Sequence, residues 1–181
     1  IVPCNGFTSV MTVPQPIWLF QDRGLAAPII AMVAGGISVV PVSPKNKRPL
    51  VVWRKFQSAL PTRADAFPWL ERFGRDCAVG LVTGPINGWV VVDADDEKDR
   101  EWVEANFPPT PVKQRTAKGV HYFYRQGKRA IPTKTRLGGR NVDIRAAGGL
   151  VIIAPSVIQG HARRFYLARH ETGHFPAYDL S

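Results

Sequence analysis

The chain has 181 residues, of which 45% are hydrophobic and 21% are charged, with 24 Lys and Arg against 14 Asp and Glu. This composition excludes a disordered tail and allows one domain, or two small modules packed closely together. A formal net charge of +10 favours a polyanionic partner, nucleic acid ahead of an anionic membrane surface. A basic surface with a purely structural role is the other explanation.

Cysteine usage and hydropathy point to a cytoplasmic protein. Cys4 and Cys77 form no CxxC pair and predict no disulfide framework, which suits a reducing cytosol. Residues 24–44 are uncharged, but prolines and glycines interrupt them, so we expect a buried segment rather than a membrane span. Because the first residue is Ile and the end is abrupt, we expect the chain to be a fragment of a longer one.

The first half of the chain predicts alternating helices and strands. After the loop-like residues 1–23, "APIIAMVA" predicts a helix that ends at Gly35-Gly36, followed by a strand, "ISVVPV". "SPKNKRPLVVWRKF" is a basic loop with room for a short strand. "TRADAFPWLERFG" predicts a helix with Thr62 as N-cap and Gly74 as its end. "AVGLVTGPINGWVVVDAD" predicts a hairpin of two strands.

The second half predicts one more helix and several strands. Asp96 can cap a helix that extends to about Asn106, with Glu97 and Asp99 in its first turn. "FPPTPVKQRT" and "GKRAIPTKTRLGGRN" are loops, and "VHYFYRQ" is a strand. "VDIRAAGGLVIIAPS" predicts strand, Gly-Gly turn, strand, and the tail after Gly160 predicts no element. The mixture predicts an α+β or α/β fold rather than a helical bundle.

The valine-rich stretch "WVVVDADDEKD" ends in a group of carboxylates. Side chains alternate along a strand, so Asp93 and Asp95 share one face, roughly 6.5–7 Å apart. Carboxylates this close repel each other, and such oxygen ligands suit Mg²⁺ or Mn²⁺. Asp143, in another apolar strand, would complete a two-metal cluster. The alternatives are a strand end that frays into solvent and, for Asp143, an ion pair with Arg145 or Arg140.

The segment "TAKGVHYFY" adds a histidine to this group. His121 and Phe123 share one face of the strand, and the two tyrosines share the other. An imidazole beside carboxylates could donate a hydrogen bond to a phosphate oxygen, while Lys118 and Gly119 could bring charge and a close backbone approach. The alternative is a histidine that only packs in the strand.

These segments resemble the bifunctional primase–polymerase (prim-pol) domain of the archaeo-eukaryotic primase superfamily, over about residues 25–160. The motifs that carry the resemblance are "ISVVPVSPKNKRPL", "AVGLVTGPINGWVVVDAD", "TAKGVHYFY" and "VDIRAAGGLVIIAPS", in that order. The resemblance implies one prim-pol domain over residues 1–181, within a larger replication protein of a plasmid, phage or mobile element. It implies an α+β fold in which an RRM-like palm packs against an N-terminal α/β module, with the active-site cleft between them.

The resemblance also implies roles for individual residues. Asp93, Asp95 and Asp143 would be catalytic ligands of two Mg²⁺ or Mn²⁺ ions. His121 would be catalytic and contact the triphosphate of the incoming nucleotide. Further residues near the nucleotide would be Lys118, Gly119, Arg145 and Ser156. Many relatives have a serine two residues before the histidine, where this chain has Gly119.

The implied reaction is template-directed nucleotidyl transfer. A 3′-hydroxyl attacks the α-phosphate of a dNTP or NTP, and pyrophosphate leaves. The implied partners are a DNA template and primer and an attached or associated helicase, with no membrane. The implied location is the cytoplasm of a prokaryotic cell or of a phage's host.

Basic residues gather in two clusters that we hypothesise bind the template backbone. The DNA-binding candidates are Lys45, Lys47, Arg48, Lys128, Arg129, Lys134, Arg136 and Arg140, with Arg54 and Lys55 extending the first cluster. A generic solvated surface is the alternative.

Three rival functions fit parts of the sequence. "HETGH", residues 170–174, matches the HExxH pattern of zinc hydrolases, but Gly173 and Pro176 disfavour the helix that this chemistry needs. "KGVHYFY" partly resembles the RNP1 motif of non-enzymatic RRM modules, although His121 stands where a small residue belongs. A metal-dependent nuclease could use the same carboxylates.

Overall fold

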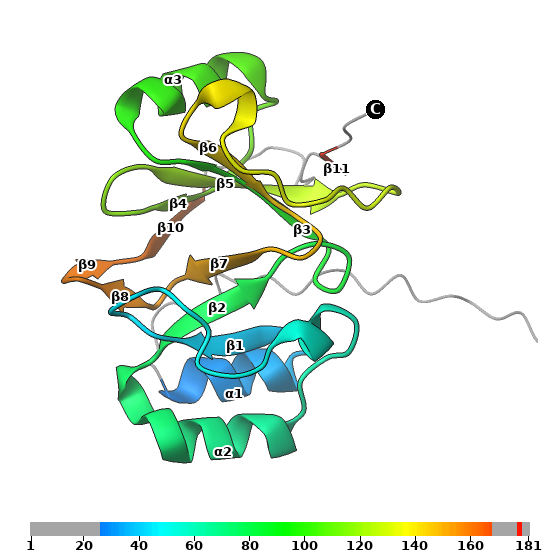
Figure 1. The fold of residues 1–181 in the computed structure, drawn as a ribbon, viewed down its shortest axis with the longest axis vertical. Helices are drawn as coiled ribbons and strands as arrows, with labels where there is room; N and C mark the ends of the chain where they lie inside the picture. Colours follow the sequence, from blue (N-terminus) through cyan, green and yellow to red (C-terminus); the bar gives the residue numbers. More distant parts are fainter. Residues whose placement is uncertain (1–25, 168–176, 179–181) are drawn as a thin grey trace, which may run out of the picture.

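The structure is a computed structural model that describes residues 26–167 and 177–178, which form a mixed α+β fold on two main sheets (Figure 1). The smaller sheet is antiparallel, in the order β1-β2-β7: β1 Val39–Val42, β2 Ala78–Val82 and β7 Leu150–Ile153. The larger sheet has five strands in the order β10-β4-β5-β3-β6: β3 Trp89–Ala94, β4 Val112–Arg115, β5 Val120–Gln126, β6 Val142–Arg145 and β10 Arg164–Leu167. A sixth strand, β11 Ala177–Tyr178, runs parallel to the end of β5. A separate ribbon pairs β8 Val157–Ile158 with β9 His161–Ala162.

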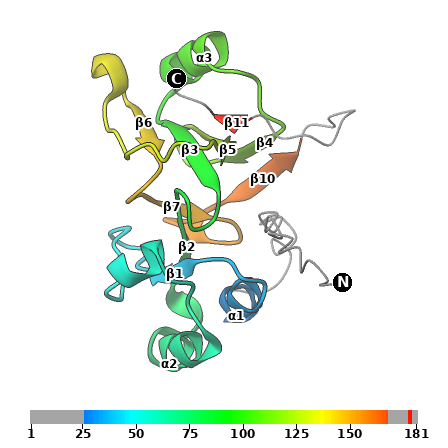
Figure 2. The ribbon, with the colours of Figure 1, turned by 90° about the vertical axis from the view of Figure 1, so that its right-hand side faces the viewer.

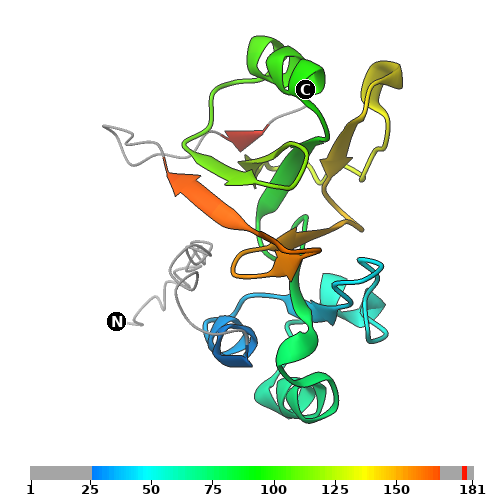
Figure 3. The same cartoon turned by 90° about the vertical axis from the view of Figure 1, so that its left-hand side faces the viewer.

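Helices cover the outer sides of the two sheets (Figure 1). α1 (Ala26–Ala34) and α2 (Arg63–Phe73) lie beside the small sheet, and α3 (Glu97–Asn106) lies beside the large one. The views in Figures 2 and 3 show the same layers, with the two sheets between the helices. Short 3₁₀ turns occur at η2 Arg54–Gln57, η3 Gly74–Asp76 and η4 Leu137–Gly139.

The two faces of the large sheet contribute to two different cores. Trp89 and Val91 of β3 belong to the core that the large sheet shares with the small sheet. Val90 and Val92 point the other way, into a second core beneath α3. Both faces of β3 are therefore buried, and the period-two alternation of its side chains determines which core each residue enters.

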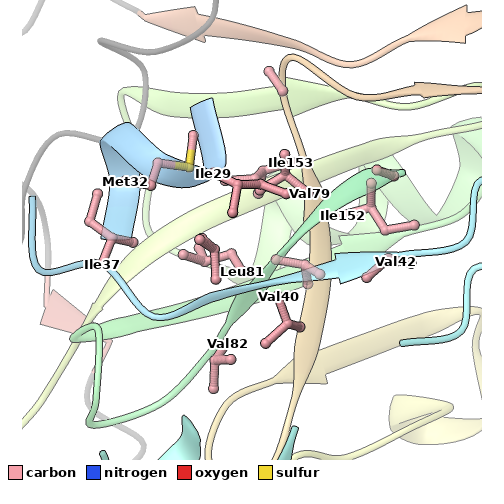
Figure 4. Packing of buried hydrophobic residues seen from close by; sticks show 14 of the residues in the cluster. Ile29, Met32, Ile37, Val40, Val42, Val79, Leu81, Val82, Ile152 and Ile153 are labelled. Atoms are coloured by element: carbon pink, nitrogen blue, oxygen red, sulfur yellow. The ribbon is translucent and has the colours of Figure 1, made fainter. Parts of the chain in front are cut away.

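The first core extends through the small sheet to α1, as Figure 4 shows at close range. Ile29 and Met32 of α1 pack with Val79 and Leu81 of β2, all fully buried. Burying side chains of this size stabilises the fold by roughly 1.5–3 kcal/mol each. The uncharged segment that follows residue 24 is thus a core segment. Within the described part of the chain, no helix has the length and apolar character needed to cross a membrane.

Several predicted elements are confirmed with their termini. α1 ends where Gly36 takes a positive φ of 74°, as the Gly-Gly pair predicts. Thr62 caps α2 and Gly74 ends it, with Pro68 accommodated inside the helix. The side chain of Asp96 accepts a hydrogen bond from the Asp99 backbone N–H at the start of α3.

The predicted hairpin of β2 and β3 is wrong, because the two strands belong to different sheets. Only an isolated bridge joins Gly84 to Trp89 at the turn. The side chain of Asn87 donates hydrogen bonds to the carbonyls of Val82 and Ser38 and accepts one from the Ser38 backbone N–H. These bonds provide partners for backbone polar groups at the point where the chain leaves the small sheet. Each strand then has neighbours on both sides in its own sheet.

Strands occur in two segments for which the sequence predicted neither a helix nor a strand. The supposed loop "FPPTPVKQRT" contains β4, and the tail contains β10, which pairs with β4 in antiparallel register. A strand of only four residues carries too short a pattern to be distinguished from a loop. The predicted loop 1–23 and the HETGH motif lie outside the described residues.

The capping box of α2 makes a pH-dependent contribution to stability. Lys55 and the Thr62 backbone N–H donate to the carboxylate of Asp65, which lowers the pKa of Asp65 from 3.8 to about 2. Because the pKa is lower in the folded state, this stabilisation is complete above about pH 4 and is lost as the pH falls towards 2.

We therefore expect Asp65→Asn to lower the free energy of unfolding by about 1 kcal/mol or less at pH 7, since Lys55 is largely exposed. The difference from wild type should shrink between pH 4 and pH 2 in urea unfolding. Glu71→Gln, at an exposed site on the same helix, is the control and should show no such trend. A pH-independent effect of Asp65→Asn would contradict the assignment.

Candidate active site

A row of side chains crosses the large sheet on the face that looks towards the small sheet. Asp93 of β3 is paired directly with His121 of β5 on one side and with Asp143 of β6 on the other. His121 is paired in turn with Gln114 of β4. Directly opposed residues project to the same face, with Cβ atoms about 4.5–5.5 Å apart. The strand register thus brings together three of the residues that the sequence singled out.

Asp93 is the most enclosed carboxylate of this row. Its side chain is 16% exposed, and its Oδ1 lies 3.2 Å from Nε2 of His121. That contact lacks good hydrogen-bond geometry, so Oδ1 is a buried oxygen without a hydrogen-bond partner among the described residues. Burial alone would raise the pKa of Asp93, but His121, Arg145 and Arg163 together hold it below its usual value. Asp93 is therefore a buried anion that depends on the His121 ring and on the two guanidinium groups near it.

Asp95 follows the end of β3 and faces the same group of charges. Burial raises its pKa, and repulsion from Asp93 and Asp143 raises it further. Asp93 and Asp143 are thus close enough to Asp95 to affect its ionisation. The backbone N–H of Asp95 donates to the Asn141 carbonyl at 3.2 Å, which ties this residue to the start of β6.

Asp143 makes the ion pair that was the alternative to metal binding. Its Oδ2 accepts from Arg145, and its Oδ1 accepts from the Arg136 backbone N–H at 2.9 Å. A cation would have to compete with both contacts, and no group of three or more His, Cys, Asp or Glu among the described residues is arranged as a ready metal site. The donor set nevertheless fits a hard cation, because it offers three mutually repelling carboxylates and the unpartnered Oδ1 of Asp93.

The row borders a pocket of about 450 Å³ lined by residues from both sheets. Of the residues predicted from sequence, it contains Asp93, Asp95, Lys118, His121, Arg145 and Lys47. The small-sheet side contributes Trp53, Leu150 and Ile152, among others. The pocket therefore combines carboxylates and cations against an apolar wall, as ligand sites commonly do.

Arg163 lines the same pocket and was missed in the sequence. The residue is 6% exposed, and its Nε and Nη1 have no hydrogen-bond partner among the described residues. Burial lowers the pKa of Arg163, and the carboxylates of Asp93 and Asp95 oppose that shift. A buried guanidinium with free donors is suited to an anionic ligand. The tail "RRFYLARH" held several similar arginines, so composition could not identify this one.

Two predicted nucleotide residues lie elsewhere. Ser156 is fully buried outside the pocket, where its hydroxyl accepts from the Val79 backbone N–H at 2.8 Å. Gly119 allows a close approach of chains, because a Cβ there would lie 1.7 Å from the Ala94 carbonyl oxygen. Because the backbone of Ala94 and Asp95 lies this close, position 119 accommodates no residue larger than glycine.

Of the basic residues predicted to bind DNA, one lines the pocket and the others lie outside it. Lys47 lines the pocket, whereas Lys45 lines a separate surface hollow. Arg140 lies over the ring of Trp102 and 3.7 Å from Asp99, so it is held against α3. The other members of the two clusters lie outside the pocket: Arg48, Lys128, Arg129, Lys134 and Arg136.

The aromatic residues of β5 are buried rather than presented to solvent. Tyr122 and Tyr124 pack beneath α3, and Phe123 is fully buried between the sheets. An RNP1-type module stacks bases on exposed aromatics of this strand, so these side chains do not offer that surface.

The comparison with protein-family models matches residues 29–177 to the family described as "Bifunctional DNA primase/polymerase, N-terminal". This range includes strands β1 to β10 and every residue that lines the pocket. A search among curated proteins finds no match.

The close approach at Gly119 leads to a stability prediction. We expect Gly119→Ala to lower the free energy of unfolding by about 1–3 kcal/mol, because the added Cβ would collide with backbone that has little room to move. Gly36→Ala is the control, since nothing lies within 4 Å of a Cβ there and only the positive φ is unfavourable, at about 1–2 kcal/mol.

Crystal structures or amide spectra of the two variants distinguish the mechanisms. Gly119→Ala should displace residues 94 and 95, whereas Gly36→Ala should leave them unchanged. An unshifted 94–95 segment in Gly119→Ala would contradict this account.

Proposed function

The chain belongs to the bifunctional DNA primase/polymerase family, and from this premise we propose that it catalyses template-dependent nucleotidyl transfer in the pocket between its sheets. The observation that carries the proposal is the row formed by Asp143, Asp93 and His121, with Asp95 beside it. The wall of the pocket includes Asp93, Asp95 and His121, and Asp143 lies directly beside Asp93 on the next strand, so carboxylates for cations and an imidazole for a phosphate oxygen lie close together. We further propose that the pocket is the cleft between the N-terminal module and the catalytic palm of one prim-pol domain.

In this proposal Asp93, Asp95 and Asp143 hold two Mg²⁺ or Mn²⁺ ions. When bound, such ions lower the pKa of the attacking hydroxyl and neutralise charge on the triphosphate. The row's position at the pocket wall would set the nucleotide's reacting phosphate beside the carboxylates.

The cations of the pocket would bind the triphosphate. His121 would donate from Nε2 to a phosphate oxygen, while Lys118 and Arg145 would add positive charge. Arg163, with its free donors, would make charge-assisted bonds to the same polyanion. Since each of these groups already faces the pocket, binding would require little reorganisation.

Our proposal for the biological setting is based on the family and not on the geometry. We propose DNA template and primer as partners, bound in part by the basic clusters, and a role in plasmid, phage or mobile-element replication. We also propose a helicase as a cooperating partner, and either a dNTP or an NTP as the nucleotide substrate.

Primer extension with Mg²⁺ or Mn²⁺ tests this function directly. We expect Asp93→Asn to reduce extension by more than about 100-fold, because changes beyond the direct ligands of a metal already cost 10- to 100-fold. Asp96→Asn is the matched control: it also removes one carboxylate nearby, but Asn caps a helix as well as Asp. Absence of metal-dependent incorporation by the wild type, or full activity of folded Asp93→Asn, would overturn the proposal.

The role of Arg163 gives a separate prediction. Arg163→Met keeps much of the apolar stem but removes the charge, so we expect the KM for the nucleotide to rise roughly 10- to 100-fold. Arg164→Met, at the exposed neighbouring position, should leave KM unchanged. Steady-state kinetics at saturating primer measure both, and equal KM values for the two variants would exclude Arg163 from nucleotide binding.

A further inference from the structure

Gln114 is a buried amide at the centre of the site that the proposed function does not use. It is fully buried on β4, directly opposite His121. Its Nε2 donates to the Ile152 carbonyl at 2.8 Å and lies 3.1 Å from Nδ1 of His121. Its Oε1 accepts from the Ala154 backbone N–H at 2.8 Å. The amide therefore uses both of its amino hydrogens and its oxygen without water.

The two backbone contacts fix which way the amide faces. A backbone N–H can only donate, so the amide oxygen must face Ala154. A carbonyl can only accept, so the amino group must face Ile152. Because the same amino group faces His121, it donates its second hydrogen to Nδ1. Nδ1 must then be an acceptor, and the ring hydrogen must lie on Nε2.

We propose that Gln114 is a positioning residue that holds His121 as the neutral tautomer with its hydrogen on Nε2. Nε2 lies 3.2 Å from Oδ1 of Asp93, and His121 lines the pocket. His121 therefore enters the reaction as a hydrogen-bond donor to a phosphate oxygen and not as a proton acceptor. The use made of that donor rests on the proposed function, whereas the tautomer itself does not.

The amide also links His121 to the other sheet. Ile152 belongs to β7 of the small sheet, and Ala154 follows it. The backbone of the small sheet thus orients Gln114, and Gln114 orients an imidazole of the large sheet. A change in the spacing of the two sheets would alter the tautomer as well as the shape of the pocket.

Nitrogen-15 NMR of the histidine rings tests the inference in the wild-type protein, without metal or nucleotide. We expect His121 to show a protonated Nε2 and an unprotonated Nδ1 at neutral pH, with its signals assigned by their loss in His121→Gln. A ring protonated on Nδ1, or on both nitrogens, would overturn the proposal. This measurement needs no variant of Gln114 to fold.

Variants of Gln114 test the cause. Gln114→Met removes the donor, so both tautomers should be populated, and Gln114→Glu presents an acceptor, so the hydrogen should move to Nδ1. Loss of the Nε2 donor should reduce kcat/KM for the nucleotide about 10- to 100-fold, the size of a hydrogen bond to a charged group. Thr110→Val is the control, because it removes a different buried side-chain donor, one that bonds to the Phe123 carbonyl of β5, without touching His121.

The outcomes separate this inference from the proposed function. If folded Gln114→Met or Gln114→Glu keeps the wild-type ring signals, Gln114 does not set the tautomer and the inference fails. If wild-type His121 carries a hydrogen on Nδ1 while Asp93→Asn still abolishes extension, the inference about the tautomer fails and the proposed function stands. If the ring signals respond as expected but the protein shows no extension, the tautomer stands and its catalytic use fails.

Discussion

One lateral row across the large sheet determines the site: Gln114, His121, Asp93 and Asp143 are successive cross-strand neighbours on β4, β5, β3 and β6. A shift of β3 by one residue would turn Asp93 into the core beneath α3 and expose its valines to the opposite face. The fold disfavours this shift, because it would bury the Asp93 carboxylate among the apolar residues of that core. The register thus keeps Asp93 at the pocket and Asp143 beside it, although both carboxylates repel that of Asp95.

The electrostatics of the site depend on the short distances between these carboxylates, which the strand register imposes. A basic protein gathers carboxylates at one point, and buried or half-buried cations surround them: Arg145 against Asp143, and Arg163 near Asp93 and Asp95. The result is a pocket with both signs of charge on an apolar background. An anionic ligand and cations can then be held together, which neither a uniformly acidic nor a uniformly basic surface would do.

Local patterns in the sequence predicted the faces of β3 and β5 and the caps of α2 and α3, because alternation and capping involve residues close in the chain. They did not predict that β2 and β3 separate into two sheets, since Asn87 satisfies Ser38 across 49 positions of sequence. Gln114 and Arg163 were missed for the same reason. Nothing near either residue in sequence marks it, and each takes its significance from partners that only the folded chain brings close.

The way the chain crosses between the sheets has a consequence for synthesis. The small sheet receives its third strand, β7, only after most of the large sheet has been made, and β10 completes the large sheet later still. Neither half is a continuous stretch of sequence, so neither can finish folding while residues beyond 150 are still in the ribosome. The nascent chain must keep the edges of β2 and β4 unpaired until then. Truncation before β7 would therefore not leave an intact small sheet, because this sheet needs a strand that comes after most of the large sheet in the sequence.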